Sequence, residues 1–108
     1  MRNALEHCVI FITCPNLEEG RGLARGLVEE KLAACVNVVH NLESIYWWQG
    51  KIESSAEVLL IVKTSQSKWE ALQHWVKSHH SYTVPEIIAL PILEGNLAYL
   101  AWIGESVS

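Results

Sequence analysis

The chain has 108 residues, which fits one small domain spanning residues 1–108. Half of the residues are hydrophobic and only 19% are charged, and this composition excludes an intrinsically disordered protein. The net charge of −4 at pH 7 argues against a surface that binds nucleic acid through its phosphates. The longest apolar runs, at residues 8–12 and 58–62, are far shorter than the roughly 18 residues of a membrane span. We therefore expect neither a nucleic acid nor a membrane as partner.

Three cysteines, an odd number with no Cys-x-x-Cys pair, indicate reduced thiols rather than a disulfide framework. Residues 1–3 do not begin a signal peptide, because Glu6 and His7 interrupt the segment before an apolar region develops. Both features predict a cytoplasmic protein. The composition also includes five tryptophans against one phenylalanine, and because Trp is enriched at protein interfaces this excess predicts a partner for part of the surface.

The first half of the chain predicts a strand, a helix and a long hairpin. Residues 7–14 are rich in β-branched side chains and end at Pro15, which is typical of a strand. Asn16 followed by Glu19 predicts the N-cap of a helix, with apolar rows at Leu23 and Leu27 and at Ala24, Val28 and Leu32. Its three glycines each weaken a helix by about 1 kcal/mol, or else permit close packing. Residues 35–48 and 51–63 then read as two extended arms around a turn at Gln49-Gly50.

Each arm is about twice the usual five or six residues, so the tip should project or be supported by another chain. After it, the pair Ser67 and Glu70 predicts a capping box, and a helix to about Ser78. A short strand at 87–92 and a final helix capped by Asn96 complete the chain. This order predicts an α+β, ferredoxin-like βαββαβ fold with an added C-terminal helix. Its antiparallel sheet has helices on one face, and the bare apolar face favours an oligomer.

Two motifs suggest metal ligands, and each has a second interpretation. His79 and His80 are adjacent at a helix end, where neighbouring side chains diverge by about 100° and so do not readily reach one ion. The second interpretation is that both side chains interact with the dipole at the C-terminal end of the helix. No spacing typical of a preformed zinc site is present, so a site assembled between subunits is the alternative. Cys14 precedes a helix N-terminus, whose dipole would favour a thiolate ligand or nucleophile. Otherwise it is a small buried apolar residue, as we expect of Cys8 and Cys35.

Charged residues near strand ends give a weaker signal. Glu57, Lys63 and Glu86 could line a cleft between subunits, although isolated charges at such places are more often solvated or ion-paired. The sequence contains no Asp, which excludes a Ser-His-Asp triad and the usual Asp-based magnesium motifs. Gly20-x-Gly22 falls inside the predicted helix and is not a dinucleotide fingerprint. We expect neither an enzyme nor an organic cofactor.

Five segments together resemble the CutA divalent-cation tolerance family. They are Thr13-Cys14-Pro15-Asn16, residues 30–37 (EKLAACVN), residues 44–52 (SIYWWQGKI), Lys63-Thr64 and residues 85–91 (PEIIALP). The resemblance runs from about Cys8 to Trp102. It implies a homotrimer of ferredoxin-like subunits, similar to the PII signalling proteins, in which the long hairpin packs across neighbours. It also implies association with tolerance to copper and other divalent metals.

In bacterial members, the resemblance implies a Cu(II) site made of two adjacent histidines after the second helix and a first-strand Cys just before the Thr. His79 and His80 match this pattern, but the strand position is occupied here by Ile12. Cys14 lies two residues further along the same strand face, a displacement of roughly 6.6 Å, and substitutes only if the site shifts with it. Otherwise the imidazoles and Glu86 remain, and such ligands suit Cu(II) and Zn(II) better than Cu(I).

The resemblance therefore implies a trimeric protein that binds divalent cations and has no evident catalytic activity. The alternative is a PII-like signalling or scaffold module that binds a small anion or a partner protein at clefts between subunits. We expect these clefts to be lined by six residues: Tyr46, Trp48, Glu57, Lys63, Tyr82 and Glu86. We also expect Trp47 or Trp48 to contact a neighbouring subunit and Trp69 to lie in the core.

Overall fold

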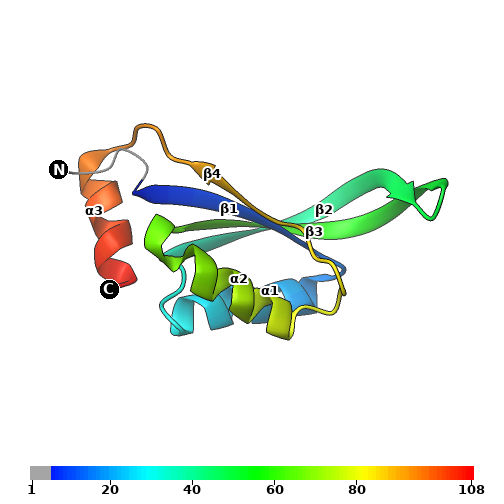
Figure 1. The fold of residues 1–108 in the computed structure, drawn as a ribbon, viewed down its shortest axis with the longest axis horizontal. Helices are drawn as coiled ribbons and strands as arrows, with labels where there is room; N and C mark the ends of the chain where they lie inside the picture. Colours follow the sequence, from blue (N-terminus) through cyan, green and yellow to red (C-terminus); the bar gives the residue numbers. More distant parts are fainter. Residues whose placement is uncertain (1–5) are drawn as a thin grey trace.

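Our computed structural model describes residues 6–108, so residues 1–3, where we expect no signal peptide, lie outside the described range. The elements are β1 (His7–Cys14), α1 (Leu17–Glu29), β2 (Cys35–Trp48), β3 (Lys51–Ser65), a 3₁₀ turn (Gln66–Lys68), α2 (Trp69–His79), β4 (Ile87–Pro91) and α3 (Leu97–Ser106). The strands form one antiparallel sheet in the order β2-β3-β1-β4 (Figure 1). This is the predicted ferredoxin-like α+β fold, with the predicted additional helix at the C-terminal end.

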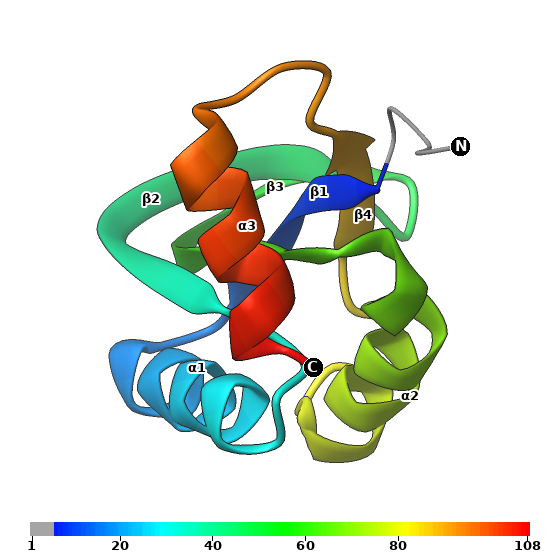
Figure 2. The same cartoon turned by 90° about the vertical axis from the view of Figure 1, so that its left-hand side faces the viewer.

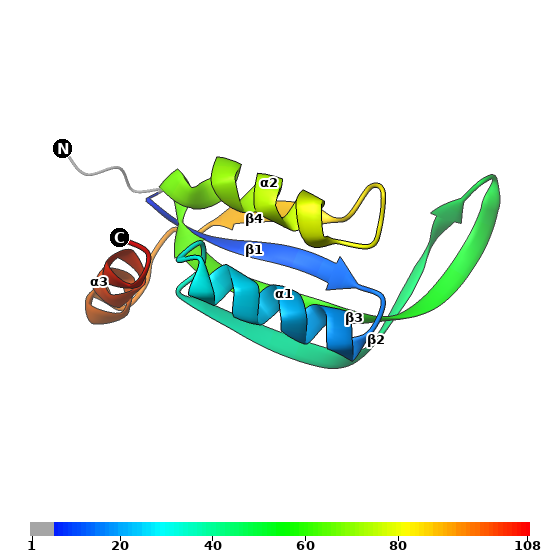
Figure 3. The same ribbon diagram turned by 90° about the horizontal axis from the view of Figure 1, so that it is seen from below.

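Helices α1 and α2 lie side by side against one face of the sheet (Figure 3). The side chains that β1 and β3 turn toward these helices alternate with period two and are buried, as in a sheet with one covered face. Leu23 and Leu27 of α1 and Leu72 and Val76 of α2 complete this core. Trp69 packs against it, as expected. Helix α3 lies across one end of the sheet, where Ile103 is fully buried (Figure 2).

The opposite face of the sheet is apolar, and residues 6–108 leave it largely uncovered. The strand register places Val9, Phe11, Leu59 and Ile61 on this face, and all four are only partly buried. On the edge strand β4, Ile88 and Leu90 are exposed. We call these six residues the open face. This is the bare apolar face that the sequence pattern predicts and from which we expect an oligomer.

The β2–β3 hairpin extends far beyond the rest of the sheet. Strand β1 ends where Cys14 pairs with Val58, and from Leu42 and Glu57 to the tip the two arms pair only with each other. Gln49 and Gly50 have φ values of 50° and 77°, the left-handed conformations that a tight two-residue hairpin turn requires. The molecule is therefore 48 Å long against 25 and 23 Å in the other directions. At the tip Trp47 is 72% exposed, so the predicted projection is confirmed.

The predicted helix caps are partly confirmed. The side chain of Asn16 accepts a hydrogen bond from the Glu19 amide at 2.8 Å, and Asn96 caps α3 in the same way. The prediction of a capping box at Ser67 is wrong, because Ser67 lies inside the 3₁₀ turn and α2 begins at Trp69 without a side-chain cap. The amide of Gln66 still bonds to the carbonyl of Glu6, so the chain turns tightly as it leaves the sheet. Ser67 therefore lacks the extended backbone of an N-cap.

Helix α1 ends earlier than its apolar rows suggest. Lys31 adopts a left-handed φ of 58°, and the amides of Lys31 and Leu32 bond back to the carbonyls of Val28 and Leu27. This is a Schellman arrangement, in which the residue after the left-handed position packs against the helix. Leu32 lies outside the helix and is nevertheless buried. Val28 is 45% exposed, so the expectation that it belongs to a buried apolar row of the helix is wrong.

Gly26 marks the contact between α1 and α2. A Cβ atom at this position would overlap the ring of Trp75, which lies directly over the helix backbone. Gly20 likewise faces β3, where an added Cβ would come within 3.2 Å of a Val58 methyl group. These two glycines therefore permit close packing. Gly22, by contrast, has no neighbouring atom within 4 Å of the added Cβ.

We expect Gly26→Ala to destabilise the protein and Gly22→Ala to stabilise it. Helix propensity favours Ala over Gly by about 1 kcal/mol at both positions. At position 26 this gain is opposed by overpacking against Trp75, which typically costs about 1–3 kcal/mol. Thermal unfolding followed by circular dichroism measures both changes. A rise in Tm for Gly26→Ala as large as that for Gly22→Ala would contradict the proposed role of the Gly26–Trp75 contact.

Candidate functional site

Most of the sequence-predicted site residues meet where β1 ends and the hairpin leaves the sheet. Cys14 ends β1, Glu57 lies on β3 just beyond the last β1 pairing, and Glu19 lies in the first turn of α1. The loop after α2 brings His80 and Tyr82 to the same place, so four segments of the chain, β1, β3, α1 and this loop, meet there (Figure 1). Sequence position alone could not reveal this convergence, because the loop conformation is set by contacts 67 residues apart.

His80 is buried, and both of its ring nitrogens are engaged. Nε2 lies 2.7 Å from the carbonyl oxygen of Thr13, and Nδ1 lies 3.0 Å from the backbone amide of Tyr82. Because an amide can only donate, we assign the neutral tautomer in which Nδ1 accepts and Nε2–H donates to Thr13. The Glu19 carboxylate is 3.4 Å from Nδ1, but it accepts a hydrogen bond from the Ser81 amide at 3.1 Å. His80 therefore fastens the loop to β1 and has no nitrogen available for a metal.

His79 points elsewhere and is exposed. Its ring stacks on Trp75, with centroids 4.0 Å apart, and Nδ1 lies 2.7 Å from the Trp75 carbonyl oxygen. A carbonyl only accepts, so Nδ1 carries the proton and donates to the last turn of α2. This contact agrees with the helix-end interpretation of the histidine pair. It leaves Nε2 without a partner among residues 6–108.

Cys14 is fully buried, and its thiol is held in the protonated form. Burial raises the pKa of Cys14 to about 12, and the negative charges of Glu19 and Glu57 act in the same direction. Of the two interpretations of Cys14, burial and the raised pKa therefore favour the small buried residue over a thiolate at the helix N-terminus. Desolvation and two carboxylates outweigh the amides of the first turn, one of which is already bonded to Asn16. Cys8 is also buried, as expected, whereas Cys35 is only partly so and lies 3.9 Å from the Lys63 ammonium.

The predicted Cu(II) ligands of one chain thus do not form a site. Within residues 6–108, no group of three His, Cys or Glu side chains is placed to hold one metal ion. Of the three predicted ligands His79, His80 and Cys14, His79 is the one that presents a free ligand atom. Any site that uses this imidazole needs further ligands from outside the chain or from water.

Three of the six predicted cleft residues lie close together. The Tyr82 hydroxyl donates to the Glu57 carboxylate at 2.9 Å, and Tyr46, whose hydroxyl is 2.6 Å from that of Ser55, lies near enough to affect the Tyr82 phenol. Burial, the hydrogen bond to Glu57 and its charge together raise the pKa of Tyr82 to about 12. The phenol therefore remains a hydrogen-bond donor at neutral pH.

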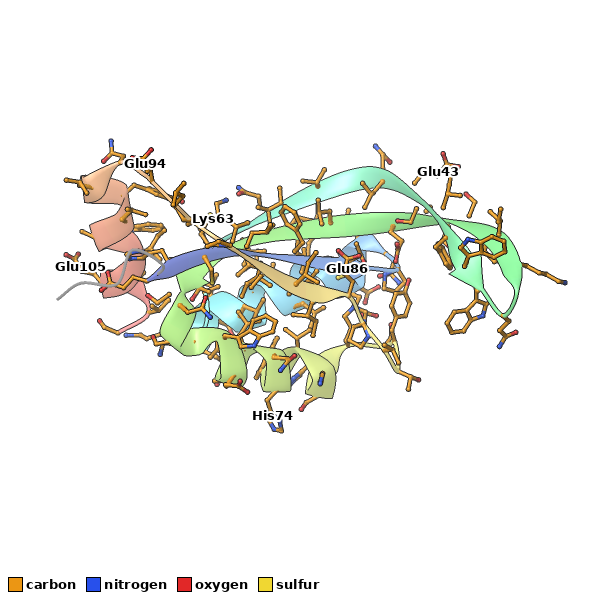
Figure 4. The ribbon with its side chains drawn as sticks, turned by 45° about the horizontal axis from the view of Figure 1, so that its top comes forward. Glu43, Lys63, His74, Glu86, Glu94 and Glu105 are labelled. Atoms are coloured by element: carbon orange, nitrogen blue, oxygen red, sulfur yellow. The ribbon has the colours of Figure 1, made fainter. Side chains whose placement is uncertain are left out.

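Of the other three cleft residues, Lys63 and Trp48 lie apart from this group within one chain, whereas Glu86 lies beside the end of β1, where Ile12 pairs with Ile87. Lys63 is six residues further along β3, roughly 20 Å away, where it donates to the side chain of Asn37. Glu86 is exposed just before β4, and Figure 4 shows it well separated from Lys63 along the sheet. Trp48 is exposed near the hairpin tip. Lys63 and Trp48 join the other cleft residues only if different copies of the chain supply them.

Three features of this region were missed in the sequence. Glu19 suggested the second half of a capping box, but its carboxylate accepts from Ser81 and does not return to the Asn16 amide. The Thr13 carbonyl, which receives His80, has no side-chain signature at all. The third missed feature is an irregularity in β2 between Val39 and Leu42, which adjoins Glu57.

We expect Glu57→Gln to lower the pKa of Tyr82 toward its ordinary value of 10.0, because the substitution removes the charge that opposes ionisation. The raised pKa also contributes stability that is complete below pH 10 and is lost as pH rises from about 10 to about 12. That alkaline loss should be smaller in the variant. Phenolate absorbance and Tm as functions of pH measure both effects, with Tyr82→Phe as control. Superimposable titrations of the wild type and Glu57→Gln would contradict the assignment.

Comparison with known proteins gives close matches over nearly the whole chain. Residues 8–106 match the family described as CutA1 divalent ion tolerance protein. Rice Protein CutA 1, chloroplastic, is 54% identical over 98 residues, which are 91% of this chain and 55% of the relative. The divalent-cation tolerance protein CutA of Thermus thermophilus is 53% identical over 98 residues, covering 91% of this chain and 95% of the relative. The chain thus spans only about half the length of the rice relative, although nearly all of the bacterial one.

Solved structures agree. The divalent cation tolerance protein from Thermus thermophilus matches with a TM-score of 0.93 at 51% identity, covering 94% of this chain and 99% of that one. CutA1 from Oryza sativa matches with a TM-score of 0.94 at 51% identity, covering 96% and 95%. No helix within residues 6–108 is long and apolar enough to cross a membrane.

Proposed function

This chain belongs to the CutA1 divalent ion tolerance protein family, and from that premise we propose that it binds divalent cations as a homotrimer, with Cu(II) or Zn(II) as the ion. The observation that carries the proposal is the arrangement of His79. Its Nδ1–H is fixed on a backbone carbonyl, and its Nε2 is free at the surface. Metal-ligating imidazoles are typically oriented by such a hydrogen bond from the second nitrogen. The remaining ligands come from other copies of the chain or from water. We propose no catalytic step.

Two features support assembly with copies of the same chain. The open face presents apolar side chains from three strands, and no further element within residues 6–108 covers them. The projecting hairpin carries Ile45, Trp47 and Ile52, each more than 60% exposed, on arms that the sheet of one chain does not support. Burial of both surfaces against neighbours would remove them from water.

We expect sedimentation equilibrium at micromolar concentration to give three times the mass of the chain. Ile61→Glu, which places a charge at the centre of the open face, should shift the protein toward monomer. His74→Glu is the matched control, since His74 is exposed on α2 in the helical layer, on the other side of the sheet (Figure 4). A monomeric wild type, or a trimer that Ile61→Glu leaves intact, would refute this mode of assembly.

We expect His79→Ala to weaken Cu(II) binding by about tenfold or more in calorimetric titration, because an oriented imidazole is lost. His74→Ala, which removes another exposed imidazole of α2, should bind as the wild type does. His80→Ala is a poor probe, since it removes two buried hydrogen bonds. Equal affinities of the wild type and His79→Ala would exclude His79 as a ligand.

The alternative is a PII-like module that binds a small anion or a partner protein at the clefts. Near Tyr82, the carboxylates of Glu19 and Glu57 make the potential negative, which disfavours an anion at this position. The exposed tryptophans of the hairpin suit a protein partner better. A thermal-shift screen separates the two functions, because stabilisation by nucleotides or organic anions and not by metals would favour the alternative.

We also propose that the protein works in a reducing compartment such as the cytoplasm. The support is that Cys8, Cys14 and Cys35 are all unpaired in the structure. A disulfide framework would be expected of a small protein exposed to oxidising conditions.

A further inference from the structure

The irregularity in β2 is a β-bulge that places His40 at the surface. Val39 pairs with Leu59 and Leu42 pairs with Glu57, so two β2 residues, His40 and Asn41, lie opposite the single residue Val58. Bulges of this kind redirect side chains and are common beside functional sites. Asn41 adopts a left-handed φ of 60°, which Asn tolerates better than most residues. Val58 remains in the core while His40 and Asn41 are both exposed.

The bulge forms one wall of a groove of about 240 Å³. The opposite wall comes from the β1–α1 junction, including Pro15 and Leu17, and Glu57 lines the groove from β3. Figure 3 shows the start of α1 and the hairpin next to each other at this end of the sheet. An imidazole, a carboxylate and a side-chain amide therefore line one groove whose opposite wall is partly apolar.

The state of Glu57 suits it to bind a cation. One carboxylate oxygen, Oε2, is held by the Tyr82 hydroxyl at 2.9 Å, which orients the group and leaves Oε1 free of that bond. Glu19 adds a second negative charge nearby, while Lys63, further along β3, is engaged with Asn37. Asn16 also lines the groove, but its Oδ1 is already occupied as the cap of α1. The described residues that line the groove include the Glu57 carboxylate and no Lys or Arg, so the potential in the groove is negative.

We propose that this groove is a divalent-cation site in which the His40 imidazole and the Glu57 carboxylate are ligands, with the Asn41 amide oxygen and water completing the shell. Imidazole and carboxylate together suit first-row ions such as Zn(II), Ni(II) and Cu(II). Tyr82 is a positioning residue, since its hydrogen bond fixes the carboxylate as the donors behind the ligands do in other metal sites. The site lies within one chain and does not depend on His79 or on the trimer, although it shares cation binding with the proposed function.

The test is a calorimetric titration of the full chain with Zn(II), which undergoes no redox change. His40→Ala and Glu57→Gln should each weaken one Zn(II)-binding event per chain by about tenfold or more. The affinity of the double variant should be only slightly lower than that of the single variant that binds more weakly. Glu57→Gln retains an oxygen that can accept from Tyr82, so the hydrogen bond that orients it is kept. His40→Gln replaces the imidazole with a polar side chain and serves if His40→Ala disturbs the bulge. His74→Ala is the control for loss of an exposed imidazole.

The outcomes separate this inference from the proposed role of His79. If His40→Ala and Glu57→Gln bind Zn(II) as the wild type does, or if only one of them matters, the groove is not a two-ligand site and the inference is overturned. If only His79→Ala loses affinity, the inference is overturned while the proposed function stands. If the groove variants lose affinity and His79→Ala does not, the inference stands and the role of His79 falls.

Discussion

The structure depends on a difference in length between its two central strands. Strand β1 has 8 residues and β3 has 15, and all eight residues of β1 pair with residues 58–65, the second half of β3. Pairing to the end of β1 buries the alternate side chains that hold α1 and α2. Beyond that end, β3 has only β2 as a partner, so the hairpin must leave the sheet. The junction also leaves the carbonyl of Thr13 at the end of a buried strand, and His80 satisfies it.

The same junction explains the chemistry of the site. Loop residues that return from α2 to β4 must pass the end of β1, and there they meet the first residues of the projecting hairpin. Glu57 is the first β3 residue beyond the β1 pairing, which makes it accessible both to Tyr82 and to the groove beside the β2 bulge. Glu19 and Glu57 both lie at this point, where they accept hydrogen bonds from the Ser81 amide and the Tyr82 hydroxyl. Burial, reinforced by the negative charges of these two carboxylates, raises the pKa of Tyr82 and of Cys14 and keeps both groups protonated.

Local signals in the sequence predicted the elements well, because each rests on nearby residues. The helix caps at Asn16 and Asn96 and the turn at Gln49-Gly50 involve only residues within one turn of backbone. The alternation of buried side chains in β1 and β3 requires only that one face of the sheet be covered. Ser67 failed because the path from β3 into α2 is fixed by a long-range bond of Gln66 to Glu6. Val28 failed for another reason: it lies within α1 but is 45% exposed, while the buried residues of the helix include Leu23, Ala24 and Leu27. Only for Ser67 did a tertiary contact decide a boundary that the sequence suggested differently.

The candidate site was harder to predict for the same reason. Adjacent histidines suggest a shared ligand, but His79 belongs to the last turn of a helix and His80 to the extended loop after it, so their rings point to different surroundings. The behaviour of Cys14 follows in part from Glu57, which is 43 residues away in the sequence and next to it only after folding. His40 carried no motif, and its position depends on a bulge that the hydrophobic pattern does not show.

The contact between Gly26 and Trp75 has an effect outside the core. The indole approaches the backbone of α1 through its Cη2 and Cζ2 atoms and also stacks on the His79 ring. The distance between the two helices therefore sets the plane of the indole, and the indole sets the plane of the imidazole. The direction of the His79 Nε2 lone pair therefore depends, through Trp75, on the absence of a side chain at Gly26 of the neighbouring helix.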